Sequence, residues 1–374
     1  MGHQFKVLEL YSGIGGMHYA VEESGLSASF VAAVDINEVA NSVYKHNFPS
    51  SMLLQRNISS LTPKEVNALK PDVIMMSPPC QPFTRVGLKK DIEDGRTDSF
   101  LHVLAVLPEL HSVQYVLLEN VKGFEISEAR NKLISALEMS GFSHQEFLLS
   151  SHNFFIPNVR LRYYLIAKRS PRKFCFPISS EVMTSFPFSL YSPEREKIVG
   201  SSCEVLIAEL QKKLHDIFNL HTEDLLCETF SIKKILESDL DENQFLVSSK
   251  TLAKYAQILD IVTPESKKSC CFTKAYGHYV EGTGSVLCPF SKELIHQTFE
   301  KCKDLDEKSD EYTNLLRNLH MRYFTPGEIA RLMCFPPNFS FPQSITLKQK
   351  YRLLGNSINV HVVALLFVLL VHEE

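Results

Sequence analysis

Short apolar runs alternate with segments of helical period over the first 170 residues of the chain. Each run is four to six residues long and is bounded by polar or glycine residues, as buried β-strands are. Thr62, Pro63 and Glu65 form a capping box with proline at the first helical position, and Ser127 marks a second helix start. This alternation predicts a doubly wound α/β fold, a mostly parallel sheet with helices on both faces. The expected strands span residues 6–10, 30–34, 72–76, 115–118, 146–149 and 162–167.

The alternation decays beyond residue 171, where prolines interrupt a stretch rich in Ser and Phe. This change of composition places a domain boundary near residue 180. Segments 194–218 and 291–319 are charged and helix-like without strong apolar periodicity, and α/β character returns near the end of the chain. We therefore expect a larger domain formed by residues 1–180 and 346–374, and a smaller inserted domain formed by residues 181–345.

The last apolar stretch, residues 360–371, is twelve residues long and is interrupted by His361. A helix that spans a bilayer needs roughly 20 predominantly apolar residues. We therefore expect this stretch to form a buried helix and expect no association with a membrane.

Charge and cysteine content limit the classes of partner and site. Lys and Arg number 39 against 43 Asp and Glu, a net charge of −4, so a nucleic acid would have to be bound by a local patch. The nine cysteines are an odd number and include no Cys-x-x-Cys pair, which favours free thiols in a reducing compartment and gives no support for a metal site. We expect a cytoplasmic location, with the nucleus as a further one.

The first predicted strand runs into a glycine turn, residues 11–17, which reads Tyr-Ser-Gly-Ile-Gly-Gly-Met. Glycines at this point let the backbone turn tightly and approach a ligand before a helix begins. Asp35 ends the next strand, where a doubly wound fold places a carboxylate to accept hydrogen bonds from a ribose. By themselves these features fit NAD, FAD or S-adenosylmethionine about equally well, or a tight turn with no ligand.

Cys80 lies in a loop, residues 77–85, that directly follows the strand predicted at 72–76. Ligands of open α/β sheets gather at the carboxyl ends of the strands, and the prolines on either side of Cys80 stiffen its loop. A lone cysteine is usually a small buried hydrophobe, but this placement favours a nucleophile. Glu119 ends the following strand at the same edge, where a partly buried carboxyl group is a candidate proton donor.

Arg160 and Arg162 open a later strand, and their spacing puts both guanidinium groups on one face. Two arginines in one cleft indicate a planar polar or anionic ligand. Without the neighbouring motifs, a pair of exposed surface arginines would explain this spacing equally well.

The basic run 168–173 has three possible interpretations: a phosphate track for a nucleic acid, a nuclear import signal, or a solvated strand end. We interpret the adjacent Cys270 and Cys271 as packing residues rather than a redox pair.

These motifs, taken in order, resemble the cytosine carbon-5 methyltransferases that use S-adenosylmethionine. Within that family the closest resemblance is to the DNA methyltransferase 2 branch, also called tRNA aspartic acid methyltransferase. The branch is marked by the form of the 77–85 loop and by residues 271–276, 281–285, 322–326 and 352–357. The resemblance implies the class I S-adenosylmethionine-dependent methyltransferase fold, Rossmann-like, with the inserted domain acting as a target-recognition domain.

The resemblance also implies a catalytic mechanism. Carbon 5 of cytosine is a poor nucleophile, so a thiolate adds to carbon 6 and makes the ring an enamine. The resemblance makes Cys80 that nucleophile and makes Glu119 the group that protonates or hydrogen-bonds ring nitrogen 3. Arg162 is expected to orient the base, with Arg160 supporting the site or a flanking phosphate. The base that removes the carbon-5 proton is not identified by the sequence.

The resemblance assigns fourteen residues to S-adenosyl-L-methionine and to its product, S-adenosyl-L-homocysteine. Many relatives carry an acid where this chain has Asn57, so the contact with adenine differs there. The expected cofactor residues are Tyr11, Gly13, Ile14, Gly15, Gly16, Met17, Asp35, Ile36, Asn57, Ile58, Ser77, Pro79, Asn356 and Ser357. The last two place the segment 355–371 beside the glycine turn.

The methyl acceptor is expected to be tRNA, aspartate tRNA first, at the cytosine at position 38 of its anticodon loop. A loop cytosine is already largely unstacked, whereas a duplex cytosine must be flipped out, and residues 271–273 point to the tRNA branch. Duplex DNA is the alternative acceptor, and an inert cofactor-binding adaptor is a third reading. A NAD-dependent oxidoreductase is the least favoured hypothesis, because that reaction gives Cys80, Glu119 and the two arginines no common role. We expect a monomer.

Overall fold

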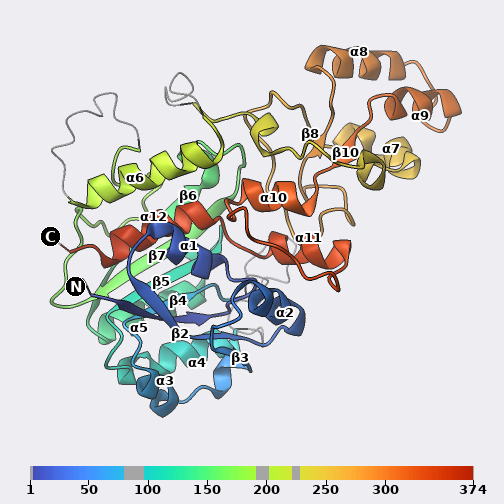
Figure 1. Cartoon of the computed structure of the whole chain (residues 1–374). Helices are drawn as coiled ribbons and strands as arrows, with labels where there is room; N and C mark the ends of the chain where they lie inside the picture. Colours follow the sequence, from blue (N-terminus) through green and yellow to red (C-terminus); the bar gives the residue numbers. More distant parts are fainter. Residues whose placement is uncertain (1–2, 80–96, 191–201, 221–227, 374) are drawn as a thin grey trace.

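A computed structural model describes residues 3–79, 97–190, 202–220 and 228–373 of the chain. Its centre is a seven-stranded sheet in the order β3-β2-β1-β4-β5-β7-β6 (Figure 1). The strands pair in parallel except for β7, which runs antiparallel to both β5 and β6. The sheet consists of β1 (Phe5–Leu10), β2 (Ala28–Asp35), β3 (Leu53–Gln55), β4 (Val73–Met76), β5 (Tyr115–Val121), β6 (Phe142–Ser150) and β7 (Leu161–Arg169).

The six strands predicted from the sequence are all present, and the short edge strand β3 is an addition. Alternate side chains of the sheet face two separate apolar clusters. On one face, Val7, Ala33 and Met75 join the cluster that contains the helices α1, α2, α6 and α12. On the other face, Leu8 and Ile74 join the cluster that contains α3, α4 and α5. Both faces are therefore covered, as predicted for a doubly wound fold.

The helices begin at the signals that the sequence supplies. α3 has the predicted capping box, in which Thr62 and Glu65 bond each other's backbone N–H, and Ser127 caps α5. The helices around the sheet are α1 (Gly16–Ser24), α2 (Glu38–Asn47), α3 (Pro63–Leu69), α4 (Asp98–Val106), α5 (Glu128–Met139), α6 (Ser202–Ile217) and α12 (Val360–Val371).

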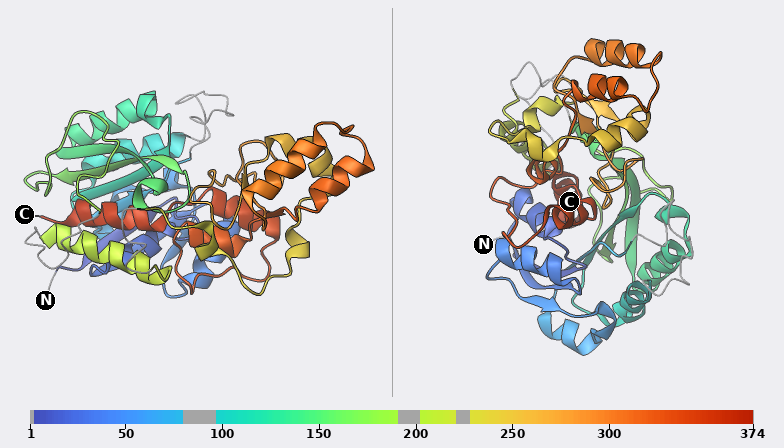
Figure 2. Two further views of the ribbon diagram at one scale, coloured as in Figure 1. Left: turned by 90° about the horizontal axis from the view of Figure 1, so that it is seen from above. Right: turned by 90° about the vertical axis from the view of Figure 1, so that its right-hand side faces the viewer.

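The apolar helix α12 is buried along its whole length, as predicted. It lies between α6 and α1 against the face of the sheet, and the two chain termini lie near each other at its end (Figures 1 and 2). The segment Leu347–Val371 has the length and composition of a membrane-spanning helix. Its apolar side chains instead pack inside the protein, where they form much of the larger apolar cluster.

A smaller three-stranded sheet, β8 (Ile261–Val262), β9 (Val286–Leu287) and β10 (Arg322–Tyr323), lies beside the large sheet with its own apolar cluster. The helices α8 and α9, in orange, form the outer end of this part of the molecule (Figures 1 and 2). The helices of this cluster are α7 (Ser249–Tyr255), α8 (Lys292–Cys302) and α9 (Asp310–Arg317), whereas α10 (Pro326–Leu332) and α11 (Leu347–Gly355) contribute to the larger cluster. The small sheet falls within the range predicted for the inserted domain, but α6 of that range packs on α12. The boundaries of the two domains stay a prediction.

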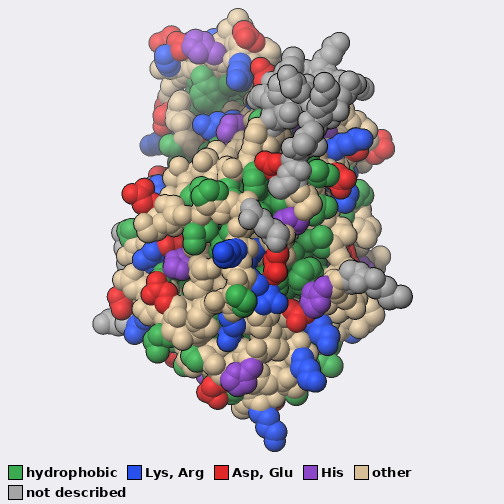
Figure 3. All heavy atoms as spheres, turned by 90° about the vertical axis from the view of Figure 1, so that its left-hand side faces the viewer, with side chains coloured by type: hydrophobic (Ala, Val, Ile, Leu, Met, Phe, Trp, Pro, Cys, Tyr) green, Lys and Arg blue, Asp and Glu red, His purple; other side chains and the backbone are tan. Residues whose placement is uncertain are grey.

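The basic run 168–173 is not a phosphate track. Because β7 is antiparallel, Arg162 pairs with the end of β5, whereas Lys168 pairs with its beginning, Tyr115. Lys168 is buried and donates to the carbonyl groups of Lys173 and His372, and Arg172 forms an ion pair with Glu373. The run therefore ties the chain terminus to the sheet. The face of the molecule drawn in Figure 3 carries basic and acidic side chains interspersed.

Candidate active site

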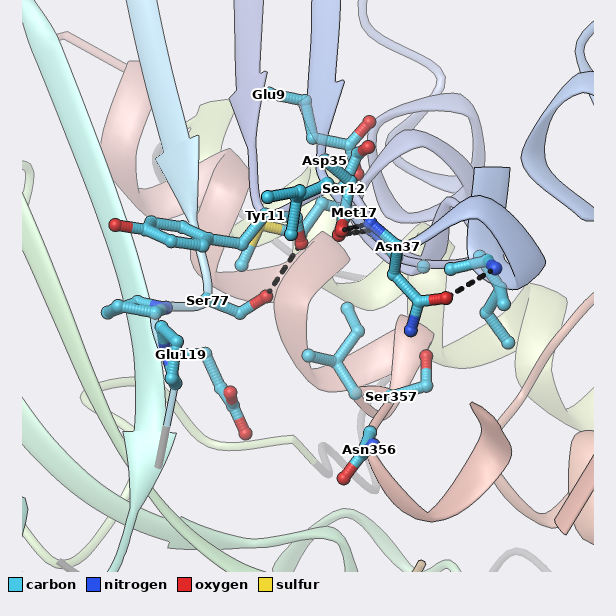
Figure 4. A pocket seen from close by; sticks show the side chains of 18 of the residues that line it. Glu9, Tyr11, Ser12, Met17, Asp35, Asn37, Ser77, Glu119, Asn356 and Ser357 are labelled. Atoms are coloured by element: carbon cyan, nitrogen blue, oxygen red, sulfur yellow. Dashed lines mark hydrogen bonds between the residues drawn. The ribbon is translucent and has the colours of Figure 1, made fainter. Parts of the chain in front are cut away.

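A cavity of about 550 Å³ lies at the carboxyl ends of β1, β2, β4 and β5. Because β7 runs in the opposite direction, its amino end reaches the same edge and contributes Arg160 and Arg162. The C-terminal segment 353–358 closes the other side. In Figure 4, Glu9 and Asp35 extend from neighbouring strands at one side of this cavity, and Glu119 extends from β5 at another.

The glycine turn has the left-handed backbone that its sequence predicts. Tyr11, Gly13 and Gly15 have φ of 57°, 55° and 84°. The turn is fastened to β2 because the Gly13 N–H donates to Asp35 Oδ2 at 2.8 Å, while Oδ1 of Asp35 accepts from the Asn37 N–H at 2.8 Å. A Cβ on Gly13 would meet only Tyr11 O, at 3.9 Å, so the backbone there is open to a ligand.

The C-terminal segment packs against this turn, which confirms the predicted return of the chain. A Cβ added to Gly16 would lie 2.7 Å from Cγ1 of Ile358 and 3.1 Å from Oγ of Ser357. Only glycine allows the two segments to approach this closely. Asn356 and Ser357 consequently line the cavity opposite the glycine turn (Figure 4).

Arg160 connects this segment to the loop that follows the smaller domain's first strand. The side chain is 3% exposed, and its Nη2 donates to the carbonyl groups of Gly355 and Ser357. Its Nη1 donates to Phe272 O at 3.3 Å. These bonds engage the guanidinium group inside the protein, which fits the supporting role predicted for Arg160 better than contact with a flanking phosphate.

Glu119 and Arg162 form an ion pair in the lining of the cavity. Arg162 Nε lies 3.4 Å from Glu119 Oε1, and both side chains are largely buried. Burial raises the pKa of Glu119, although the charges of Arg162 and Arg160 oppose this shift. A buried carboxyl group with a raised pKa can hold a proton and hydrogen-bond a base.

The predicted nucleophile, Cys80, lies outside the described residues. The strand and loop that lead to it end at the cavity, which Ser77 and Pro79 line. Ser77 Oγ donates to Tyr11 O at 3.3 Å, and Asn120 Nδ2 donates to Pro78 O at 3.4 Å. The start of the loop is thus held between the glycine turn and the end of β5.

All but one of the fourteen predicted cofactor residues line the cavity. The exception is Gly15, where a Cβ would lie 2.4 Å from Phe48 Cε2, so this glycine serves the packing of α1 on α2. The lining fits S-adenosylmethionine: Ile36, 65% exposed, and Ile58 offer apolar surface for a base, and Asp35 offers a carboxylate. The buried Glu9 Oε1 and Ser12 Oγ have no hydrogen-bond partner among the described residues and remain free for polar groups.

The sequence did not predict that Cys271 lies beside the two arginines of the site, and we had interpreted it as a packing residue. Its Sγ lies 3.4 Å from Arg160 Nη1 and 3.6 Å from Arg162 Nη2. Burial opposes ionisation of this thiol, but the charges of Arg162 and Arg160 outweigh the effect of burial and lower the pKa of Cys271.

Sequence reasoning also missed Glu9 and Ser99, which both line the cavity. Ser99 accepts a hydrogen bond from the Tyr11 hydroxyl. A carboxyl group near the end of a buried apolar strand was the available signal for Glu9.

Comparison with known proteins matches residues 5–370 to the family described as C-5 cytosine-specific DNA methylase. The chain is 46% identical to the tRNA (cytosine(38)-C(5))-methyltransferase of Bos taurus, over 98% of both chains. It is 38% identical to the DNA (cytosine-5)-methyltransferase of Dictyostelium discoideum, over 98% of this chain and 94% of the relative. Among solved structures, a DNMT2 mutant of Spodoptera frugiperda is 43% identical, with a TM-score of 0.82, over 98% of this chain and 100% of that one.

The close packing at Gly355 yields a prediction about the stability of the site. A Cβ at this position would lie 2.2 Å from both Lys274 N and Thr273 C, which are backbone atoms that cannot move aside cheaply. We expect Gly355→Ala to lower the free energy of unfolding by about 3 kcal/mol or more, as overpacking does. Chemical denaturation of the whole protein measures this change.

Gly141→Ala is the matched control. Gly141 has φ of 76°, but a Cβ there would meet nothing within 4 Å. Only backbone strain applies, which costs about 1–2 kcal/mol. Equal losses for the two variants would contradict the packing at Gly355.

Proposed function

Because the chain belongs to the C-5 cytosine-specific methylase family, and is an S-adenosylmethionine-dependent methyltransferase, we propose that its acceptor is cytosine 38 in the anticodon loop of tRNA. The observation that carries the proposal is the match over 98% of both chains to a relative named for that reaction. Aspartate tRNA is the proposed first substrate, on the resemblance of residues 271–276 to the aspartate tRNA branch.

The cavity is the proposed site of the methyl donor. S-adenosylmethionine supplies the methyl group when bound. Asp35 would hold the ribose, with Ile36, Asn57 and Ile58 around the adenine, and the glycine turn with Asn356 and Ser357 would enclose the methionine end. Asn57 accepts a hydrogen bond from the Ser59 N–H, so its amide nitrogen remains for the adenine.

We propose that the chain's own residues act on the base as follows. The Cys80 thiolate forms a bond to carbon 6, and Glu119 gives a proton or a hydrogen bond to nitrogen 3, which stabilises the enamine. Arg162 holds Glu119 in place and orients the carbonyl oxygen of the base. After methyl transfer to carbon 5, a base removes the proton on that carbon, and the electron pair left behind forms the double bond between carbons 5 and 6. The bond between sulfur and carbon 6 breaks with its electron pair, which frees the Cys80 thiolate, and any proton on nitrogen 3 returns to Glu119.

Duplex DNA is the second candidate acceptor, favoured by the description of the family and by the name of the Dictyostelium relative. A duplex cytosine must first be unstacked and unpaired, which costs a few kcal/mol. A net charge of −4 gives the protein little general attraction for a phosphate backbone. A folded RNA that presents an unstacked cytosine suits this protein better.

Methyl transfer to the two nucleic acids tests the acceptor. We expect labelled methyl groups from S-adenosylmethionine to enter total tRNA from a strain that lacks this modification, and to enter genomic DNA far more slowly. Cys80→Ala should abolish the transfer, whereas Cys302→Ala, which alters a buried thiol of the smaller domain, should retain it. Label that enters DNA alone would overturn the acceptor, and transfer by Cys80→Ala would overturn the nucleophile.

The proton on Glu119 gives a pH test of the mechanism. Because its pKa is raised by burial, the acid form is present at low pH and is lost as the pH rises through that value. Thiolate formation at Cys80 increases with pH, so the wild-type rate should pass through a maximum. We expect Glu119→Gln to lower the single-turnover rate by about 10²–10⁴-fold and to remove the fall on the alkaline side. The exposed Glu109→Gln is the control; an unchanged alkaline fall in Glu119→Gln would contradict the role.

A further inference from the structure

Glu9 is a buried acid on the wall of the cavity that the proposed mechanism does not use. It is the penultimate residue of β1, is 1% exposed, and lines the cavity at the carboxyl end of that strand. Its neighbours in register are Ala33 on β2 and Met75 on β4, which belong to the apolar cluster on the same face. A carboxylate in such surroundings loses its hydrogen bonds to water, and the apolar side chains on the neighbouring strands do not replace them.

The polar groups that face Glu9 do not supply a positive charge. The Tyr44 hydroxyl of α2 donates to Glu9 Oε2 at 3.0 Å, the His18 backbone N–H of α1 faces the carboxyl group, and Asp35 of β2 adds a negative charge. The His18 ring bonds the Tyr44 oxygen and is stacked between Phe30 and Phe48. Burial lowers the pKa of His18 to about 3, so this ring is neutral. No described lysine or arginine forms an ion pair with Glu9.

Asp35 differs from Glu9 in its hydrogen bonds. Each oxygen of Asp35 accepts a backbone N–H, from Gly13 and from Asn37. Glu9 Oε1 has no partner within hydrogen-bond geometry among the described residues. Two carboxyl groups close together at one site do not both ionise readily, and the one with fewer donors keeps the proton. The bonding pattern therefore gives the proton to Glu9 and the negative charge to Asp35.

We propose that Glu9 couples binding of the methyl donor to release of a proton: its carboxyl group is neutral in the free protein and ionises when the ammonium group at the amino acid end of the donor enters the cavity. This inference rests on the proposed site of the donor. The ionised Oε1 then provides a counter-charge for this ammonium group, and the proton leaves to the solvent.

The sign of the pH dependence follows from this coupling. Burial, with Asp35 adding to it, raises the pKa of Glu9 to about 8, against the opposing hydrogen bonds from Tyr44 and His18. Below that pH the proton must be removed before the ligand is bound, so affinity should fall as the pH falls. We expect a decrease of roughly tenfold per pH unit between pH 7 and pH 6, and little change above pH 9.

Calorimetric titration of the full chain with S-adenosylhomocysteine tests the proposal without any turnover. At pH 7, measurements in phosphate and in Tris, which differ in ionisation enthalpy, give the number of protons exchanged. We expect the wild type to release about one proton per ligand, because a group of pKa 8 is mostly protonated at pH 7. Glu9→Gln should bind with release close to zero, and Glu22→Gln, on the outer side of α1, should release as much as the wild type.

The outcomes separate this inference from the proposed function. Binding by the wild type without proton release would overturn the role of Glu9 and leave the donor site standing. Release that persists in Glu9→Gln would assign the proton to another group, Asp35 first, and overturn the proposal. Absence of any binding would overturn the donor site and this inference together. If Glu9→Gln does not fold, wild-type affinity that is flat between pH 6 and pH 9 is the contradicting result.

Discussion

One buried guanidinium group joins three segments that are distant in sequence. Arg160, at the amino end of β7, donates to carbonyl groups of residues 272, 355 and 357. Each of those carbonyl groups is a strong acceptor that would be costly to bury without a partner. The five donors of arginine are spread over a planar group with two terminal nitrogens, so one side chain reaches carbonyl groups on separate segments, whereas the three donors of lysine all lie on one nitrogen. The cavity exists in its present form because these segments meet at Arg160.

The direction of β7 sets which charges reach the site. In a sheet whose other strands are parallel, one antiparallel strand brings its amino end to the edge where the others finish. Arg160 and Arg162 therefore stand beside Glu119, while the basic run at the far end of the same strand fastens the chain terminus. The helix α12 then carries the 355–358 segment back to the glycine turn, since its apolar side chains are covered only between α1, α6 and the sheet.

The fold and most of the cavity lining could be predicted from sequence because their signals are local. Apolar runs, capping residues and glycines specify strands, helix starts and turns over a few residues each, and the order of the motifs indicated the family. The sequence left three interpretations of the basic run 168–173 open because strand direction depends on pairing across the sheet, which no local pattern encodes. Cys271 and Glu9 were missed for a related reason: their roles come from Arg160 with Arg162 and from Asp35 with Tyr44, partners supplied by other segments.

Hydrogen exchange measures whether Arg160 holds the 271–273 loop and the 355–358 segment together. Amide groups in both segments are hydrogen-bonded, Thr273 N to Thr283 O and Ser357 N to Leu354 O. In Arg160→Lys, the account predicts that both segments lose protection together while β1 and β4 keep theirs. Arg331→Lys, which alters a half-exposed arginine bonded to other carbonyl groups, should leave both unchanged. Loss of protection in one segment alone, or in neither, would contradict the account.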